Sequence, residues 1–349
     1  MRKVSTGRYF EDFGIGQHLV HALPRTLHGG DISTYMALTG ERPPLASSTE
    51  LARSLGFARE VIPDLLVFHI VFGKSVPDIS RNAVANLGYA SCLFLNPVYP
   101  GDTLTATSEV IGLKENSSGK TGVVYVRTRG FKQDGTAVLE YVRWVMISKR
   151  DAKAAAPGDH VPRLLTAVEP KLLGAACPPL DVKNYDFELA GSPHRFADYQ
   201  PGEKIDHVAG VTVEEAEHQT ATRLYQNTAR IHFDQFAAAQ SRFNRRLVYG
   251  GHAISLARAL SFNGLENAFH ITAINGGRHV APLFAGLTVF AWTEVLATSE
   301  LPGRDDVGAL RLRTIATKDR PCPDFPLKDG DEYDPAVILD LDYWSLILR

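Results

Sequence analysis

Apolar residues follow two different periods along the chain. GGHAISLARALSF, residues 250–262, has apolar side chains at helical spacing, and DLLVFHIVFGKSV, residues 64–76, is also typical of a helix. Residues 92–150 instead contain β-branched and aromatic runs that partly alternate with polar residues and are broken by PGD, KENSSGK and KQDG turns. Helix first and antiparallel strands afterwards predicts an α+β fold, with the helix on one face of a sheet.

The chain repeats this pattern at a nearly constant spacing. RYFEDFGIGQHLVH, near the start, matches RFADYQPGEKIDH in the second half at an offset of 186 residues. The same offset carries YMALTGERPPLASS onto ATRLYQNTARIHFD and VIPDLLVFHI onto LVYGGHAISL. NPVYPGDTLTATSEV follows in order and matches APLFAGLTVFAWTEV at an offset of 185. Matches in this order indicate that one module was duplicated.

The repeat divides the chain into two modules. We predict an N-terminal module at 1–150 and a C-terminal module at 191–349, joined by a linker at 151–190. The linker is rich in Ala and Pro, which is typical of a segment that crosses the surface of the first domain. With 349 residues, of which 44% are hydrophobic, the chain has enough apolar material for one large core or two ordinary cores.

Composition excludes several classes of function. A net charge of −2 gives no basic field for nucleic acid or anionic lipid, and no apolar run approaches the roughly 20 residues that span a bilayer. The start has no apolar signal segment, and GxGxxG after a strand, GxxxxGK[ST] and HExxH are absent. We therefore expect a cytoplasmic protein with no nucleic-acid or membrane partner, no metal and no cofactor. The three cysteines are far apart and indicate reduced thiols: Cys92, Cys177 and Cys322.

Several motifs together resemble one known family. The architecture, with PVYPGDTL after the long helix, resembles the MaoC-like dehydratases of the hotdog fold, which act on enoyl thioesters of coenzyme A. YMALTGER, LLVFHIVFGKSVPDIS, NLGYA, GKTGVVYVRT, EYVRWVM, YQNTARIHFDQ and YGGHAISLARAL look most like the mesaconyl-CoA hydratases, also called β-methylmalyl-CoA dehydratases. The resemblance implies a double hotdog, two tandem modules in each of which a long helix packs on an antiparallel sheet. It also implies reversible hydration of an α,β-unsaturated acyl-CoA.

The resemblance also identifies candidate catalytic residues. The hydratase motif of the group, roughly G-D-x-N-P-L-H, falls on GERPPLA in the first copy and on QNTARIH in the second. Glu41 and Asn227 therefore take the Asp place, Ala46 and His232 take the His place, and neither copy carries the intact pair. The C-terminal module, which retains the histidine, is expected to be catalytic, and the N-terminal module to be the degenerate half.

Water addition to an enoyl thioester requires a base for the water, an acid for C2 and donors for the thioester oxygen. An imidazole such as His232 suits the base, so His232→Ala is expected to lower the rate at least about 100-fold. The amide of Asn227 can hold a water or the substrate carbonyl. A carboxylate partner for His232 would be Asp234 or Glu41, although Asp234 could instead cap a helix and Glu41 could belong to a solvated turn.

Glycine marks one end of the second long helix. Gly250 and Gly251 precede HAISLARAL, where free backbone amides could bind the thioester oxygen, although a tight turn is the alternative. The first copy has Asp64 and Leu65 at this place. A carboxylate there would repel an enolate oxygen, which again favours the second copy as the working half.

Arginines are candidates for the anionic parts of the substrate. A carboxylate on the acyl group would be held by Arg230 or Arg42, because a guanidinium meets a carboxylate with two hydrogen bonds. Arg278 is a candidate for a phosphate of coenzyme A. The alternatives are an (R)-specific enoyl-CoA hydratase of general acyl chains and a catalytically silent acyl-CoA-binding protein. A homo-oligomer is compatible with all three.

Overall fold

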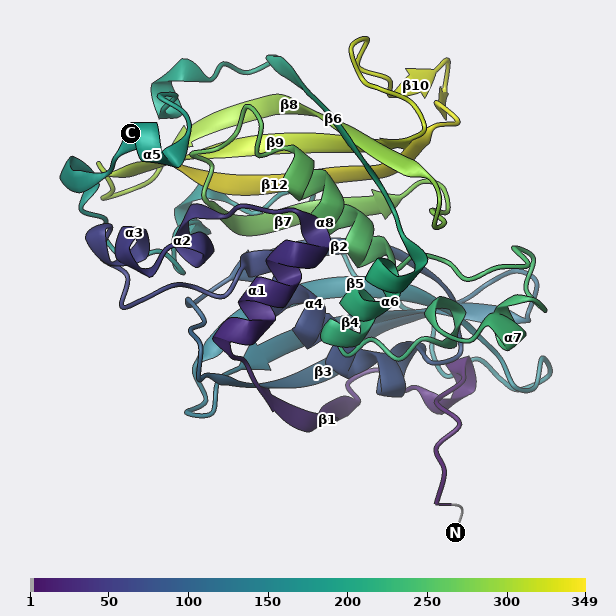
Figure 1. Cartoon of the computed structure of the whole chain (residues 1–349). Helices are drawn as coiled ribbons and strands as arrows, with labels where there is room; N and C mark the ends of the chain where they lie inside the picture. Colours follow the sequence, from purple (N-terminus) through teal and green to yellow (C-terminus); the bar gives the residue numbers. More distant parts are fainter. Residues whose placement is uncertain (1–2) are drawn as a thin grey trace.

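The strands of both copies join in one ten-stranded antiparallel sheet in this computed structural model, which describes residues 3–349 (Figure 1). Its order is β1-β3-β4-β5-β2-β7-β12-β9-β8-β6, so each half repeats the same series outward from the centre. The halves meet where β2 pairs with β7, from Tyr89 opposite Gly277 to Leu93 opposite Ala273. The strands are β1 His18–Thr26, β2 Ala83–Phe94, β3 Thr103–Glu115, β4 Thr121–Phe131, β5 Ala137–Ser148, β6 Lys204–Thr212, β7 His270–His279, β8 Thr288–Glu300, β9 Val307–Lys318 and β12 Val337–Leu348. A small hairpin adds β10 Lys328–Asp329 and β11 Glu332–Tyr333.

Helices cover one face of the sheet, as the α+β prediction required (Figure 1). The two long apolar segments of the repeat form the central helices α4, Asp64–Ser75, and α8, Gly250–Leu260. The helices that precede them are α1 Gly29–Thr39, α2 Pro44–Ser47, α3 Thr49–Ser54, α6 Glu215–Leu224 and α7 Gln235–Ala238. A short helix α5, Phe187–Ala190, belongs to the segment between the copies.

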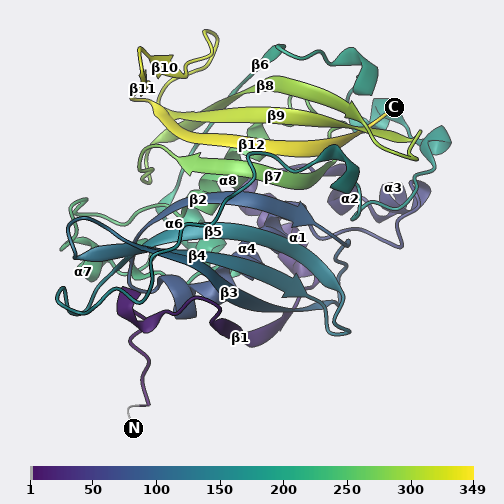
Figure 2. The same ribbon diagram turned by 180° about the vertical axis from the view of Figure 1, so that it is seen from behind.

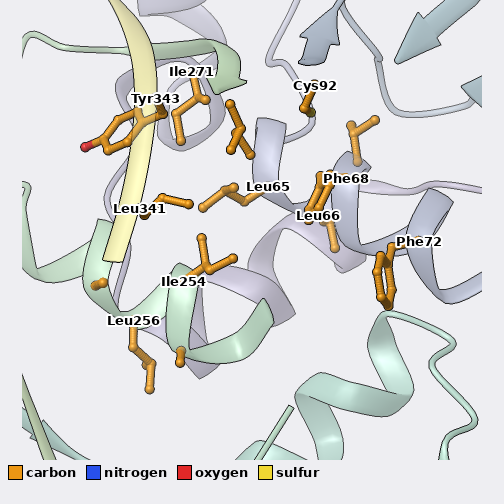
Figure 3. Close-up of a cluster of buried hydrophobic side chains, with 14 of the residues drawn as sticks. Leu65, Leu66, Phe68, Phe72, Cys92, Ile254, Leu256, Ile271, Leu341 and Tyr343 are labelled. Atoms are coloured by element: carbon orange, nitrogen blue, oxygen red, sulfur yellow. The ribbon is translucent and has the colours of Figure 1, made fainter. Parts of the chain in front are cut away.

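The central helices pack against each other in the main core. Their apolar side chains meet strand residues beneath them, as Figure 3 shows for Leu65, Phe68, Ile254 and Leu341. His69 of α4 lies across from Ser255 of α8, with 2.9 Å between its Nε2 and the serine Oγ. These two residues are equivalent in the repeat, so the helices are related by a local twofold axis near this contact. Each helix therefore starts beside the end of the other.

The connecting segment crosses the face of the sheet that has no central helices (Figure 2). Its His160 forms an isolated bridge to Leu113 of β3, in the first copy. Farther on, the amide of Val168 donates to Asn275 of β7 at 2.8 Å. This segment therefore contacts strands of both copies rather than only the first.

Candidate active sites at the starts of the two central helices

The first candidate site surrounds the start of α8, where the predicted residues of the second copy lie. His232 ends a short 3-10 helix and is buried, with its Nδ1 2.8 Å from the carbonyl oxygen of Leu247. Because a carbonyl oxygen only accepts, Nδ1 carries the hydrogen and Nε2 is the nitrogen that can take a proton. Burial lowers the pKa of His232 to about 4, so its ring is neutral at pH 7.

The neighbours of His232 in sequence have other partners. Asn227 accepts from the amide of Ala229 at 2.9 Å through Oδ1, which leaves its NH₂ group as a donor. Asp234 accepts from Arg230 at 2.7 Å and from the amide of Ala237 at 2.9 Å, so it caps α7. These two bonds, the backbone bond first, lower the pKa of Asp234. No hydrogen bond joins Asp234 to His232, and Arg230 lies at the surface with 63% of its side chain exposed.

The two glycines at the start of α8 allow close approach of aromatic rings. A Cβ on Gly250 would lie 2.5 Å from the ring of His279. A Cβ on Gly251 would lie 2.7 Å from Nδ1 of His69, which comes from α4 of the other copy and is buried without a hydrogen-bond partner. Burial lowers the pKa of both histidines, that of His279 to about 4. Side chains of both copies therefore meet at this site.

The second candidate site is a cleft at the start of α4. It is partly open to solvent, and its free volume for water-sized molecules is about 30 Å³. The first copy contributes the GERPPLA segment, the start of α4 and the end of β2, and the second copy contributes Arg258 of α8 and the start of β7. Apolar side chains form most of the wall, for example Ala46, Leu65, Phe94 and Ile271. An apolar cleft with a few converging polar groups is the usual form of a small-molecule site.

An Asp–His pair joins the two copies at this cleft. Oδ1 of Asp64, the first residue of α4, lies 2.8 Å from Nδ1 of His270, the first residue of β7. The other oxygen accepts from the amide of Ile271 at 2.9 Å. Because a carboxylate only accepts, Nδ1 of His270 carries the hydrogen and Nε2 is left as an acceptor. That Nε2 is buried and has no partner among the described residues.

Glu41, predicted from the motif, lies in this cleft and not beside His232. Burial is the largest cause of the shift in the pKa of Glu41, which it raises to about 7. Arg258 and the hydroxyl of Tyr35 act in the opposite direction. Its Oε2 is buried without a hydrogen-bond partner. A carboxyl with this pKa is partly protonated at neutral pH and can therefore donate a proton.

The remaining predicted residues lie on the surface. Arg42 is exposed and stacks over the ring of Phe262 at 4.5 Å. Arg278 is exposed on β7 and lies over Tyr333 at 5.3 Å. Within the described chain, the contacts of Arg42 and Arg278 do not identify either residue as part of a ligand site.

Sequence reasoning missed two members of the cleft, His270 and Arg258. His270 belongs to none of the quoted motifs, and Arg258 lies inside YGGHAISLARAL, where SLARAL is typical of an ordinary helix and does not indicate a ligand. From the sequence, Asp64 is predicted to be a carboxylate that would repel an enolate. Its two hydrogen bonds provide the partners that the sequence could not reveal. The repeat gave one usable signal, because Arg258 stands where the first copy has Phe72.

Two modules, each with a long helix on an antiparallel sheet, define the class of double-hotdog proteins. A MaoC domain protein from Chloroflexus aurantiacus has a TM-score of 0.97 with this chain at 58% identity, covering 100% of this chain and 99% of that chain. A Mycobacterium tuberculosis protein with a double hotdog fold has a TM-score of 0.78 at 26% identity, covering 99% of each chain. The predicted fold is confirmed.

The sequence comparisons define the family. The model of the mesaconyl-CoA hydratase family matches residues 2–328. The β-methylmalyl-CoA dehydratase of Chloroflexus aurantiacus is 58% identical over 354 residues, covering 99% of each chain. The mesaconyl-CoA hydratase of Cereibacter sphaeroides is 55% identical over 349 residues, covering 99% of this chain and 100% of the relative. The chain belongs to the mesaconyl-CoA hydratase family, as its motifs predicted.

The described residues contain no membrane-spanning helix and no cluster of metal ligands. None of the described helices has the length and apolar character needed to cross a membrane. Within residues 3–349, no cluster of three or more His, Cys, Asp or Glu side chains could hold a metal ion. All three cysteines are buried and free.

Proposed function

We propose that this chain catalyses the reversible hydration of mesaconyl-CoA to β-methylmalyl-CoA, with the reaction in the cleft at the start of α4. Its membership of the family and the names of its two close relatives support the substrate. The observation that carries the choice of site is the Asp64–His270 pair, which leaves an unpartnered imidazole nitrogen in the same cleft as the protonatable Glu41.

The groups that line the cleft support this proposal. In the forward direction, Nε2 of His270 takes a proton from water as the water oxygen bonds to C3, and the electrons of the double bond move toward the thioester oxygen. Asp64 stabilises the imidazolium that forms, and protonated Glu41 gives its proton to C2. Proton transfer from His270 to Glu41, through solvent, restores both groups for the next turnover.

The start of α4 provides the donors for the thioester oxygen. The first amides of a helix, here those of Asp64, Leu65 and Leu66, have no carbonyl partner within the helix and carry a partial positive charge. Leu65 lies in the cleft wall, so a thioester seated there meets these amides. The carboxylate of Asp64 opposes this effect less than a free carboxylate would, because both of its oxygens accept hydrogen bonds.

The start of α8 is a second candidate site for the same reaction. His232 presents a neutral imidazole whose orientation is fixed by Leu247, and Asn227 keeps two N–H donors free in the same loop. In this alternative, His232 is the base and the amides of Gly250 and Gly251 bind the thioester oxygen. It is the site that the motif predicts, and it places all of these groups in the second copy.

A matched pair of variants separates the two sites. Hydration of mesaconyl-CoA is followed by loss of the enoyl thioester absorbance for the wild type, His270→Ala and His232→Ala. We expect turnover by the wild type, a loss of at least about 100-fold in kcat in His270→Ala and a change below about threefold in His232→Ala. The reverse pattern would place the chemistry at α8.

Other substrates test the function itself. Turnover of crotonyl-CoA without turnover of mesaconyl-CoA would refute the proposal in favour of an (R)-specific enoyl-CoA hydratase. Binding of enoyl-CoA thioesters without any turnover would refute it in favour of a silent acyl-CoA-binding protein.

A further inference from the structure

We infer that Arg258 binds the free carboxylate of the substrate and thereby selects carboxylated enoyl thioesters over plain ones. This inference rests on the proposed function and concerns the same cleft. Mesaconyl-CoA carries a methyl group on C2 and a carboxylate on C3, so its anionic group lies next to the carbon that water attacks. A cation beside that carbon would both recognise the substrate and orient it.

Arg258 is a buried cation without a matching anion. It is 9% exposed, belongs to α8 and lines the cleft. Its Nη1 donates to Ser261 Oγ at 2.9 Å, and its Nη2 donates to the carbonyl oxygen of Ala268. Both acceptors are neutral, and no ion pair joins its guanidinium to a carboxylate in residues 3–349. A guanidinium has five N–H groups, so three remain for a ligand.

The acidic groups of the cleft do not supply the missing partner. Asp64 is already bound by His270 and by the amide of Ile271. Glu41 has a pKa of about 7, so at neutral pH it spends about half of its time uncharged. A buried charge is costly unless it is paired, and a substrate carboxylate is the partner that a planar guanidinium binds best.

The repeat argues against a purely structural role for Arg258. The equivalent residue of α4 is Phe72, which is buried among aromatic rings. The packing of the two central helices therefore accepts an apolar residue at this position. The arginines that the sequence suggested for the carboxylate differ from Arg258, because Arg230 and Arg42 are both exposed to solvent.

A pair of substrates tests the inference. 2-Methylcrotonyl-CoA keeps the thioester, the double bond and the C2 methyl of mesaconyl-CoA but has a methyl group in place of the carboxylate. In Arg258→Met we expect kcat/KM for mesaconyl-CoA to fall about 100-fold or more, and kcat/KM for 2-methylcrotonyl-CoA to change less than about threefold. Arg258→Lys should recover part of the loss. Arg129→Met on β4, where the arginine side chain is 55% exposed, serves as a matched control that leaves both values unchanged.

Binding measured by calorimetry separates this inference from the proposed function. If the wild type binds mesaconyl-CoA at least about 30-fold more tightly than Arg258→Met does but hydrates nothing, the hydratase proposal fails and the carboxylate site stands. Equal losses with both substrates, no recovery in Arg258→Lys, or unchanged discrimination in Arg258→Met would each overturn the inference. Thermal unfolding of Arg258→Met and Arg258→Lys checks that these two variants fold.

Discussion

Replacing Glu41 by glutamine is expected to stabilise the protein at alkaline pH while it removes activity. Burial raises the pKa of this carboxyl from the ordinary 4.5 to about 7. Between these values the folded protein holds a proton that the unfolded chain has lost. The stability that comes from the protonated form is therefore fully present below about pH 4.5 and is lost as the pH rises through about 7.

The size of the effect follows from the two pKa values. Titration of a single group with these values lowers the free energy of unfolding by about 2–3 kcal/mol between pH 5 and pH 8. Glutamine has nearly the same shape and no charge at either pH. Relative to the wild type, Glu41→Gln should therefore gain about 2–3 kcal/mol in the free energy of unfolding when the pH is raised from 5 to 8. The residue is only 9% exposed, so solvent screens this effect little.

Urea unfolding at pH 5 and pH 8, followed by tryptophan fluorescence, measures this difference. The control is Glu50→Gln, because the side chain of Glu50 is 87% exposed and its removal should have no such pH dependence. In kinetics, kcat/KM of the wild type should fall above about pH 7 as Glu41 ionises, whereas Glu41→Gln should be at least about 100-fold less active and lack this decline. The reasoning is refuted if the stability difference between Glu41→Gln and wild type is the same at both pH values.

Three further substitutions test packing and chemistry. Gly73→Ala should destabilise the protein by about 3 kcal/mol despite the helix preference of alanine, because its Cβ would collide with the backbone carbonyl of Tyr225. Gly30→Ala in α1, where a Cβ meets nothing within 4 Å, should leave the melting temperature unchanged or raise it, and equal behaviour of the two variants would contradict the packing argument. Asp64→Asn should lower kcat about 100-fold or more, because an amide can donate to Nδ1 of His270 and reverse its tautomer. Wild-type kcat in this variant would exclude the Asp–His pair from the reaction.

The fold could be predicted because its evidence is distributed along the whole chain. Helical periods at 64–76 and 250–262, strand patterns after each, and an offset that stays near 186 all indicate the same duplicated module. The structure places those segments in α4, α8 and the strands that follow them. The sequence also offered helix capping as an alternative role for Asp234, and Asp234 does cap α7. This role could be predicted because a single carboxylate before QFAAAQ is a local signal.

The cleft could not be predicted because its groups meet only after the two copies pair. Ile271, whose amide binds Asp64, is 207 residues away from it in the chain. The motif suggested a partnership of Glu41 with His232, yet the pairing of the copies puts Glu41 with Arg258 at one end of the central helices and His232 at the other. The motif predicts a catalytic role for His232 and the proposed site does not, and the matched histidine variants test the two alternatives.

The two copies are joined where β2 pairs with β7, so a substrate bound between the copies would help to hold them together. Glu41 and Leu65 of the first copy and His270 of the second line the α4 cleft, so a ligand bound there as proposed would contact both halves and resist their separation. A ligand that binds only the folded chain raises its free energy of unfolding by about 2.7 kcal/mol at a ligand concentration 100 times Kd. A substitution that loosens the β2–β7 ladder, far from any reacting atom, would for the same reason be recognised first as weaker substrate binding.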